Sequence, residues 1–148
     1  MRGASALDQL LTEFKDAPIK VMVVWEPVLK TDFAAPLNRV LGLLHDPRVA
    51  QHWDPERILS ADLVRSVNEN PSRYGREEPL PADFIAWDVV AVFGKDARWD
   101  RDLPPPAYYG GPVVEAIEEA RKAIEEEVGG TSPVTAPTGS PPHSGSQR

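Results

Sequence analysis

A short, nearly uninterrupted apolar run constrains the fold of this chain more than any other feature. Residues 19–25 read Ile-Lys-Val-Met-Val-Val-Trp, and Lys20 alone interrupts them. β-Branched residues favour extended backbone, and a run without polar alternation is typical of a strand that is covered on both faces. Strands of this kind occur in sheets that carry helices, so the run predicts an α/β protein.

A second run of the same kind lies far along the chain. Residues 84–93 contain Ile85, Trp87, Val90 and Val92, and they predict another mostly interior strand. The long, proline-punctuated connection between the two runs fits a parallel pair joined by a right-handed helical crossover. We therefore predict a three-layer α/β/α sandwich with a small mixed sheet.

Helical periodicity covers much of the remaining body. Amphipathic helices are predicted over 7–14, 37–44, 61–68 and 113–128. Ser5 and Ser60 are expected to cap the first and the third of these helices. Two Asp-Pro pairs, Asp46-Pro47 and Asp54-Pro55, resemble the starts of further short helices.

Two polar or glycine-rich stretches predict connections. Residues 70–82 are polar and contain prolines, so they predict a loop. Residues 107–114 place Gly110-Gly111 between short segments with strand character, which predicts a small hairpin.

The composition changes sharply at Gly129. Fifteen of the 20 residues from there to Arg148 are Gly, Ser, Thr or Pro, and Val134 is the only branched aliphatic residue. So little apolar surface cannot offset the roughly 1–2 kcal/mol per residue that ordering a backbone costs. We therefore expect one folded domain over 1–128 and a disordered tail over 129–148.

Charge and cysteine content exclude several classes of function. The chain has 16 Lys and Arg against 23 Asp and Glu, a net charge of −7, so nucleic acid is not an expected partner. No apolar run approaches the about 20 residues of a membrane span, and no signal peptide is recognisable, so we expect a soluble, cytoplasmic protein without a membrane partner. The absence of cysteine removes disulfides, zinc–thiolate sites and thiol catalysis.

The order of the predicted elements resembles that of the thioredoxin-like family. Trp25 ends the first strand, where thioredoxins carry a tryptophan before the active-site helix. Pro106 stands where that family keeps a cis-proline before a strand, and Gly110-Gly111 takes the place of the hairpin turn before the last helix. Residues 5–128 are similar to an uncharacterised group of bacterial thioredoxin-like proteins.

The chain departs from this family at the redox centre. Glu26-Pro27-Val28-Leu29 stands where the resemblance would place Cys-x-x-Cys. Thiol–disulfide exchange needs a thiolate nucleophile, so a thiol–disulfide oxidoreductase is excluded. The resemblance implies a fold, and it does not imply the family's activity.

The loop after the first strand is the main candidate site. Trp25, Glu26, Thr31 and Asp32 follow the carboxyl end of a predicted parallel strand, where open α/β sheets bind ligands. Glu26 and Asp32 could form an acid/base pair or bind a hard cation. The alternative is structural, with Thr31 or Asp32 as a helix cap and Glu26 in solvent.

Two histidines and two aspartates lie close together in the sequence. His45, Asp46, His52 and Asp54 are ligand types, but Pro47 interrupts their spacing and both aspartates fit helix caps, so no metal site is predicted.

Four tryptophans are many for so small a domain. Trp53 and Trp87 are expected in the core, and Trp99 is expected to hold the 95–106 loop against the body. For Trp25, core and surface roles remain open.

The expected function is binding. The candidate binding site has six members: Trp25, Glu26, Thr31, Asp32, Pro106 and Tyr108. If the strand after Pro106 paired as in thioredoxins, the proline would lie beside the end of the first strand and leave backbone free for an extended peptide. We expect a redox-inactive module, without a cofactor, for a peptide, protein or small molecule. The alternatives are a non-redox enzyme that uses Glu26 and Asp32 and a self-assembling structural protein.

Truncation tests the assignment of the tail. A chain that ends at Gly130 should melt within about a degree or two of the full chain, because residues 129–148 add no apolar periodicity to any element. Calorimetry of the two chains measures the difference, and a loss of several degrees would mean that the tail packs on the domain.

Overall fold

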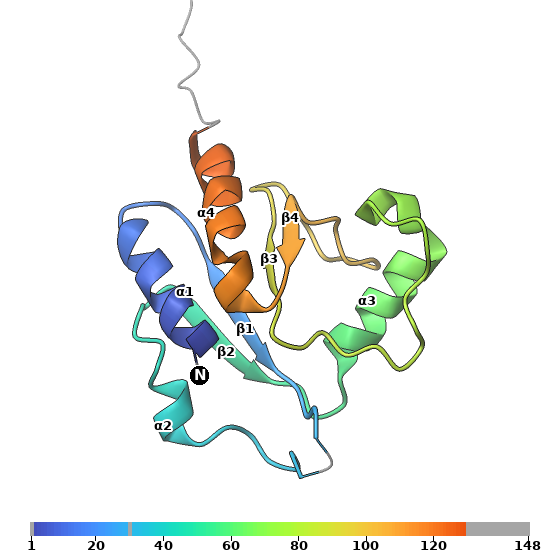
Figure 1. The fold of residues 1–148 in the computed structure, drawn as a ribbon, viewed down its shortest axis with the longest axis horizontal. Coiled ribbons are helices and arrows are strands. Elements are labelled where there is room, and N and C mark those ends of the chain that lie inside the picture. The colour runs from blue at the N-terminus through green and yellow to red at the C-terminus, as the bar shows by residue number, and fades with distance from the viewer. Residues whose placement is uncertain (1, 30, 130–148) are drawn as a thin grey trace, which may run out of the picture.

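The protein has a mixed α/β architecture (Figure 1), seen in a computed structural model that describes residues 2–29 and 31–129. Helices and strands alternate along most of these residues. Their bounds are α1 Arg2–Glu13, β1 Val21–Trp25, α2 Asn38–Leu41, β2 Val49–Trp53, α3 Ile58–Glu69, the 3₁₀ helix η1 Pro71–Tyr74, β3 Val90–Val92, β4 Tyr108–Gly110 and α4 Val113–Gly129. The predicted tail lies outside the described residues, except for Gly129.

β1 pairs in parallel with β2, in a register that runs from Val21 opposite Val49 to Trp25 opposite Trp53. The prediction that residues 19–25 pair with the run at 84–93 is therefore wrong. The sequence does not reveal the strand at 49–53, because the flanking pairs Asp46-Pro47 and Asp54-Pro55 resemble helix starts.

Both Asp-Pro pairs in fact open hydrogen-bonded turns. The N–H of Val49 donates to the carbonyl of Asp46 at 3.1 Å, and the N–H of Arg57 donates to the carbonyl of Asp54 at 3.3 Å. These turns deliver the chain into β2 and out of it, so Asp and Pro act here as turn formers.

β3 and β4 form a separate antiparallel pair, in which Val90 lies opposite Gly110 and Val92 opposite Tyr108. The prediction of a hairpin that turns at Gly110-Gly111 is wrong, because β4 ends at Gly110 and its partner is β3. A glycine is needed at position 111 for another reason. A Cβ atom there would lie 2.7 Å from the carbonyl oxygen of Asp88, too close for any other residue.

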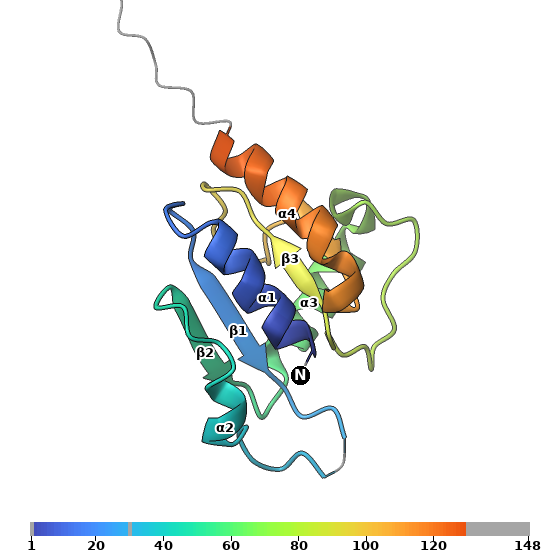
Figure 2. The same ribbon diagram turned by 60° about the vertical axis from the view of Figure 1, so that its left-hand side comes forward.

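α1 and α4 pack side by side, and α4 also covers β3 and β4 (Figure 2). The predicted helices over 7–14 and 113–128 are confirmed, although α1 begins before Ser5, which therefore does not cap it. The buried face of α4 is centred on small side chains, Ala116, Ala120 and Ala123, which permit close approach to Val92. No helix in the described part of the chain is long and apolar enough to cross a membrane.

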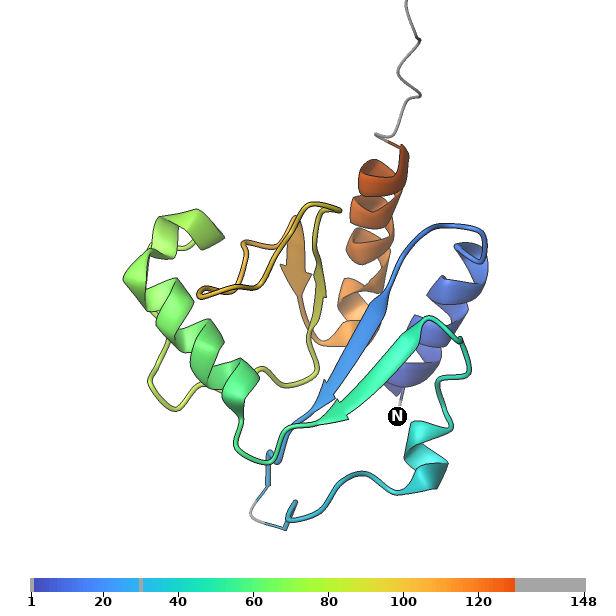
Figure 3. The same ribbon diagram turned by 180° about the vertical axis from the view of Figure 1, so that it is seen from behind.

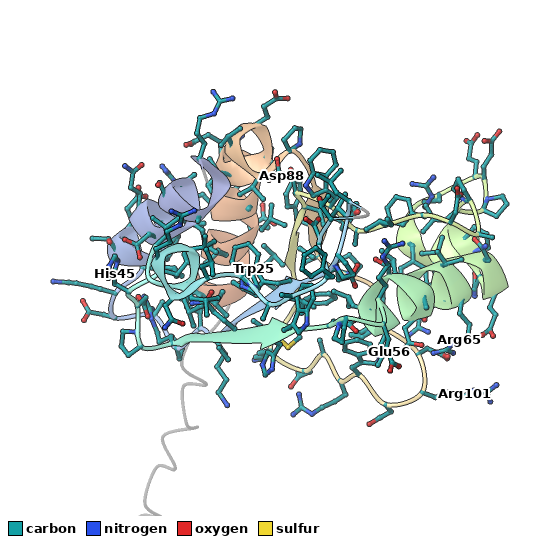
Figure 4. The ribbon with its side chains drawn as sticks, turned by 90° about the horizontal axis from the view of Figure 1, so that it is seen from below. Trp25, His45, Glu56, Arg65, Asp88 and Arg101 are labelled. Carbon is teal, nitrogen blue, oxygen red and sulfur yellow. The ribbon has the colours of Figure 1, made fainter. Side chains whose placement is uncertain are left out.

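α3 stands apart from this helix pair, on the far side of β3 and β4 in Figure 1, and it is held by the loop 93–107. Arg65 of α3 pairs with Asp102 at 3.0 Å and donates to the carbonyl of Arg101 at 2.7 Å (Figure 4). The buried hydroxyl of Ser66 accepts the N–H of Leu103 at 3.1 Å.

One face of the β1–β2 pair has no helix over it in the view from behind (Figure 3). Met22 on this face is 57 % exposed. The expectation that the first strand is covered on both faces is therefore wrong, since α3 lies to one side of the β1–β2 pair. Trp87, expected in the core, is also on the surface with 69 % exposure, because β3 begins only at Val90.

Arg48 joins the start of β2 to the end of α1. Its guanidinium donates to the carbonyls of Leu11 (2.7 Å), Phe14 (2.5 Å) and Ala17 (3.2 Å), which are among the last acceptors of the helix and its exit turn. Asp46 orients this group, accepting from Nε at 2.9 Å and from Nη2 at 2.6 Å. A cation at the carboxyl end of a helix also favours the helix dipole.

The Asp46–Arg48 pair predicts how the stability of the domain depends on pH. Hydrogen bonds from Arg48 lower the pKa of Asp46 from 3.8 to about 2. Because the folded-state pKa is depressed, the stabilisation is complete above about pH 4 and is lost as the pH falls toward 2.

Melting temperatures of the wild type and of Asp46→Asn, measured from pH 7 to pH 2, should therefore differ by several degrees at neutral pH and converge at pH 2. A gap that stays constant over this range would show that the carboxylate charge of Asp46 does not stabilise the fold.

Candidate functional site

Trp25 ends β1 and is held in place by a side-chain relay. Its indole N–H donates to Oε1 of Gln51 on β2 at 3.1 Å, and Nε2 of Gln51 donates to the carbonyl of Leu41 at 2.9 Å. The ring is half-buried near the middle of the molecule in Figure 4. Trp25 therefore ties β1, β2 and the end of α2 together.

Glu26 reaches across to the first turn of α3. Its Oε1 accepts the N–H of Ser60 at 3.0 Å, and its Oε2 accepts the hydroxyl of Ser60 at 2.5 Å. The same hydroxyl accepts the N–H of Ala86 at 2.9 Å. Ser60 thus lies within α3 and is not its cap, and the half-buried Glu26 has a hydrogen-bond partner for each carboxylate oxygen.

Asp54 supplies a second carboxylate to the same helix end. Its Oδ2 accepts the N–H of Leu59 at 2.9 Å. The first N–H groups of a helix have no partner within the helix, and they carry a partial positive charge that favours an anion. Glu26 and Asp54 therefore satisfy the start of α3 from two different connections.

Asp32 stabilises the loop that follows β1. Its Oδ2 accepts the N–H groups of Val28 (3.0 Å) and Leu29 (2.8 Å), so it binds the backbone just before it in the loop. Thr31 is exposed. The structure does not turn Glu26 and Asp32 toward a common ligand, because each carboxylate is occupied by hydrogen bonds in a different part of the fold.

Pro106 and Tyr108 lie elsewhere. Pro106 precedes β4, which begins at the upper end of the molecule in Figure 1, whereas β1 ends at the lower end. Tyr108 packs against the core between β3 and α4. Among the described residues the cis peptide bond precedes Pro112 and not Pro106. The six candidate residues are thus not assembled into one site, and binding at them stays a prediction.

The histidines and their neighbouring aspartates are also separated. The N–H of His45 donates to Asp8 on α1 at 3.1 Å (its side chain is labelled in Figure 4), while Asp46 is paired with Arg48. Within residues 2–29 and 31–129, no three His, Cys, Asp or Glu side chains form a group that could hold a metal ion.

A groove that the sequence did not indicate opens where the uncovered face of β1 and β2 meets α3 and the loop 93–107. Its volume is about 450 Å³. Its apolar lining residues are Met22, Val24, Trp53, Pro55, Ile58, Leu59 and Trp99. Its polar side chains are His52, Asp54 and Glu56. We call this feature the Trp53–Trp99 groove.

The apolar surface continues beyond the Trp53–Trp99 groove along the strands. A second hollow of about 720 Å³ lies over the beginning of β1, between residues 17–22 and 47–50, and shares Met22 with the groove. Open concave sites of several hundred Å³ with a mostly apolar lining are typical of ligand binding. Recognition of strand β2 and of its exposed face would have been needed to find them from the sequence.

The hydrogen bonds of Glu26 predict a structural role that a catalytic role would not require. Glu26→Ala leaves two donors of Ser60 unpaired, and Ser60 is 2 % exposed, so the free energy of unfolding should fall by about 1–3 kcal/mol. Thr31→Ala, on the exposed side of the same loop, should change it by less than about 0.5 kcal/mol.

Urea denaturation of the three proteins measures both effects. Wild-type stability in Glu26→Ala would contradict the structural role of Glu26 and return the residue to the list of candidate catalytic groups.

Comparison of the chain with protein-family models, with curated proteins and with solved structures found no match in any of the three.

Proposed function

We propose that this protein is a redox-inactive, thioredoxin-like binding module that holds a peptide segment in the Trp53–Trp99 groove. The observation that carries the proposal is the groove itself, whose lining joins Trp99 to the aliphatic residues Met22 and Val24 at a sheet face without a covering helix. Contiguous exposed apolar surface is costly in water and marks sites of interaction.

The order of elements supports the thioredoxin-like part of the proposal. Two parallel strands joined through a helical connection precede a helix, an antiparallel pair and a closing helix. Two features of the expected sandwich are missing in the described residues, since no ladder joins β1 to β3 and the cis bond does not precede Pro106. The proposal therefore uses the topology as an expectation about architecture and takes the site from the groove.

The alternative of a non-redox enzyme has less support. Glu26 accepts hydrogen bonds from Ser60, and Asp32 accepts hydrogen bonds from the N–H groups of Val28 and Leu29. A general acid or base must reach the substrate within hydrogen-bond distance, and neither carboxylate opens onto the Trp53–Trp99 groove. Self-assembly through the apolar face is the second alternative, and light scattering over a range of concentrations distinguishes it.

A peptide array tests the proposal directly. The full chain, applied to an array of random decapeptides, should be retained on a subset of spots, and Trp99→Ala should weaken that retention about tenfold or more because a buried indole dominates such contacts. Trp87→Ala removes an indole that lies outside the groove and is more exposed, at 69 % against 39 % for Trp99, and it should leave retention unchanged. Disulfide reduction should stay at the uncatalysed rate in all three proteins.

The array and the reductase assay also define failure. Equal retention of the two tryptophan variants would remove the Trp53–Trp99 groove as the binding site. Clear turnover of a disulfide substrate would overturn the redox-inactive part of the proposal.

A further inference from the structure

The chemistry of the Trp53–Trp99 groove narrows the kind of partner that it takes. We propose that the groove binds a peptide through an arginine side chain, which lies against the indole ring of Trp99 and brings its guanidinium to the carboxylates of Asp54 and Glu56. This inference rests on the proposed function, because it specifies the ligand chemistry of the same groove.

The first argument is charge complementarity. The lining holds two carboxylates, Asp54 and Glu56, and neither lysine nor arginine. Asp54 uses only Oδ2 in the hydrogen bond to α3, and Glu56 is exposed just before that helix, as Figure 4 shows. The net charge of the whole chain, −7, also attracts cations. A positively charged ligand is therefore the complement of this surface.

The nearest arginines do not neutralise these carboxylates. Nε of Arg57 donates to the carbonyl of Pro27 at 2.7 Å, and Nη1 of Arg98 donates to two carbonyls in its own loop. In the part of the chain that the structure describes, the ion pairs involve neither Asp54 nor Glu56. Both groups are thus available to a cation from outside.

The second argument is the aromatic lining. Trp99 comes from the loop 93–107, lines the groove and is 39 % exposed. Trp53 ends β2 at the same place, but strand alternation puts its side chain on the face of Gln51, so the stacking surface is that of Trp99 alone. Cations bind to the face of an indole more strongly than to other aromatic rings. A guanidinium is planar and weakly hydrated, so it stacks on such rings better than an ammonium group does.

The third argument is the apolar floor. Met22 and Ile58 are both more than half exposed, at 57 % and 56 %, and both line the groove. The aliphatic stem of an arginine can cover this surface while its charged head remains at the edge, near Glu56. A short acidic or neutral polar side chain would neither cover Met22 and Ile58 nor pair with the carboxylate of Glu56.

Two fluorescent peptides that differ at one position test the inference on the full chain. One carries arginine between two leucines, and the other carries citrulline there, which has the same shape without the charge. Fluorescence anisotropy should show that the arginine peptide binds about fivefold or more tightly than the citrulline peptide.

Four variants assign any difference to the groove. Glu56→Gln should weaken the arginine peptide about two- to fivefold and leave the citrulline peptide unchanged, whereas Glu125→Gln on the outer surface of α4 should alter neither. Trp99→Ala should weaken both peptides, and Trp87→Ala should weaken neither. Circular dichroism verifies that each variant is folded.

The outcomes separate the two levels of the proposal. Equal binding of the two peptides, with Trp99→Ala weakening both, overturns the arginine preference and leaves the proposed binding function in place. No binding of either peptide, or the same effect from Trp99→Ala and Trp87→Ala, overturns both. An unchanged affinity of Glu56→Gln for the arginine peptide overturns the role of the carboxylate edge.

Discussion

The guanidinium of Arg48 is the interaction on which the arrangement of the first half of the protein depends. It donates to the carboxylate of Asp46, which orients it, and to carbonyls at the end of α1 and in its exit turn. Because Arg48 directly precedes β2, the same contacts set where that strand begins relative to the helix. β2 then pairs with β1 over its whole length. The largest fully buried side chains of the domain are only leucines, Leu10 and Leu11. A polar side chain, Arg48, therefore helps to position these elements.

Polar side chains also position α3. The carboxylates of Glu26 and Asp54 come from two different connections, and both end on the first N–H groups of this helix. Residues at the ends of parallel strands are often functional, yet helix termini must be satisfied whatever the function. Here that requirement uses Glu26, one of the two carboxylates that the sequence offered as an acid/base pair.

The Trp53–Trp99 groove is a consequence of two contacts that fix the position of α3. Glu26 holds the start of α3 at the edge of the sheet, and Arg65 holds the helix to the loop 93–107. α3 therefore lies beside the β1–β2 face instead of over it, and Met22 stays exposed. The loop brings Trp99 to the rim of the space that the helix leaves open. Apolar surface and uncompensated carboxylates meet there, which is the basis for the proposed arginine recognition.

The amino-acid sequence by itself determined the elements whose signal is local. The spacing of apolar residues in α1 and α4 and the β-branched run of β1 express backbone geometry, and the lack of cysteine excludes thiol chemistry without any structure. The tertiary structure alone decided strand pairing and exposure. Residues 49–53 became a strand because β1 offered a ladder to a segment of mixed pattern, and Trp87 lay outside because β3 is short. The groove joins segments far apart in the chain, and no local pattern encodes which of them will meet.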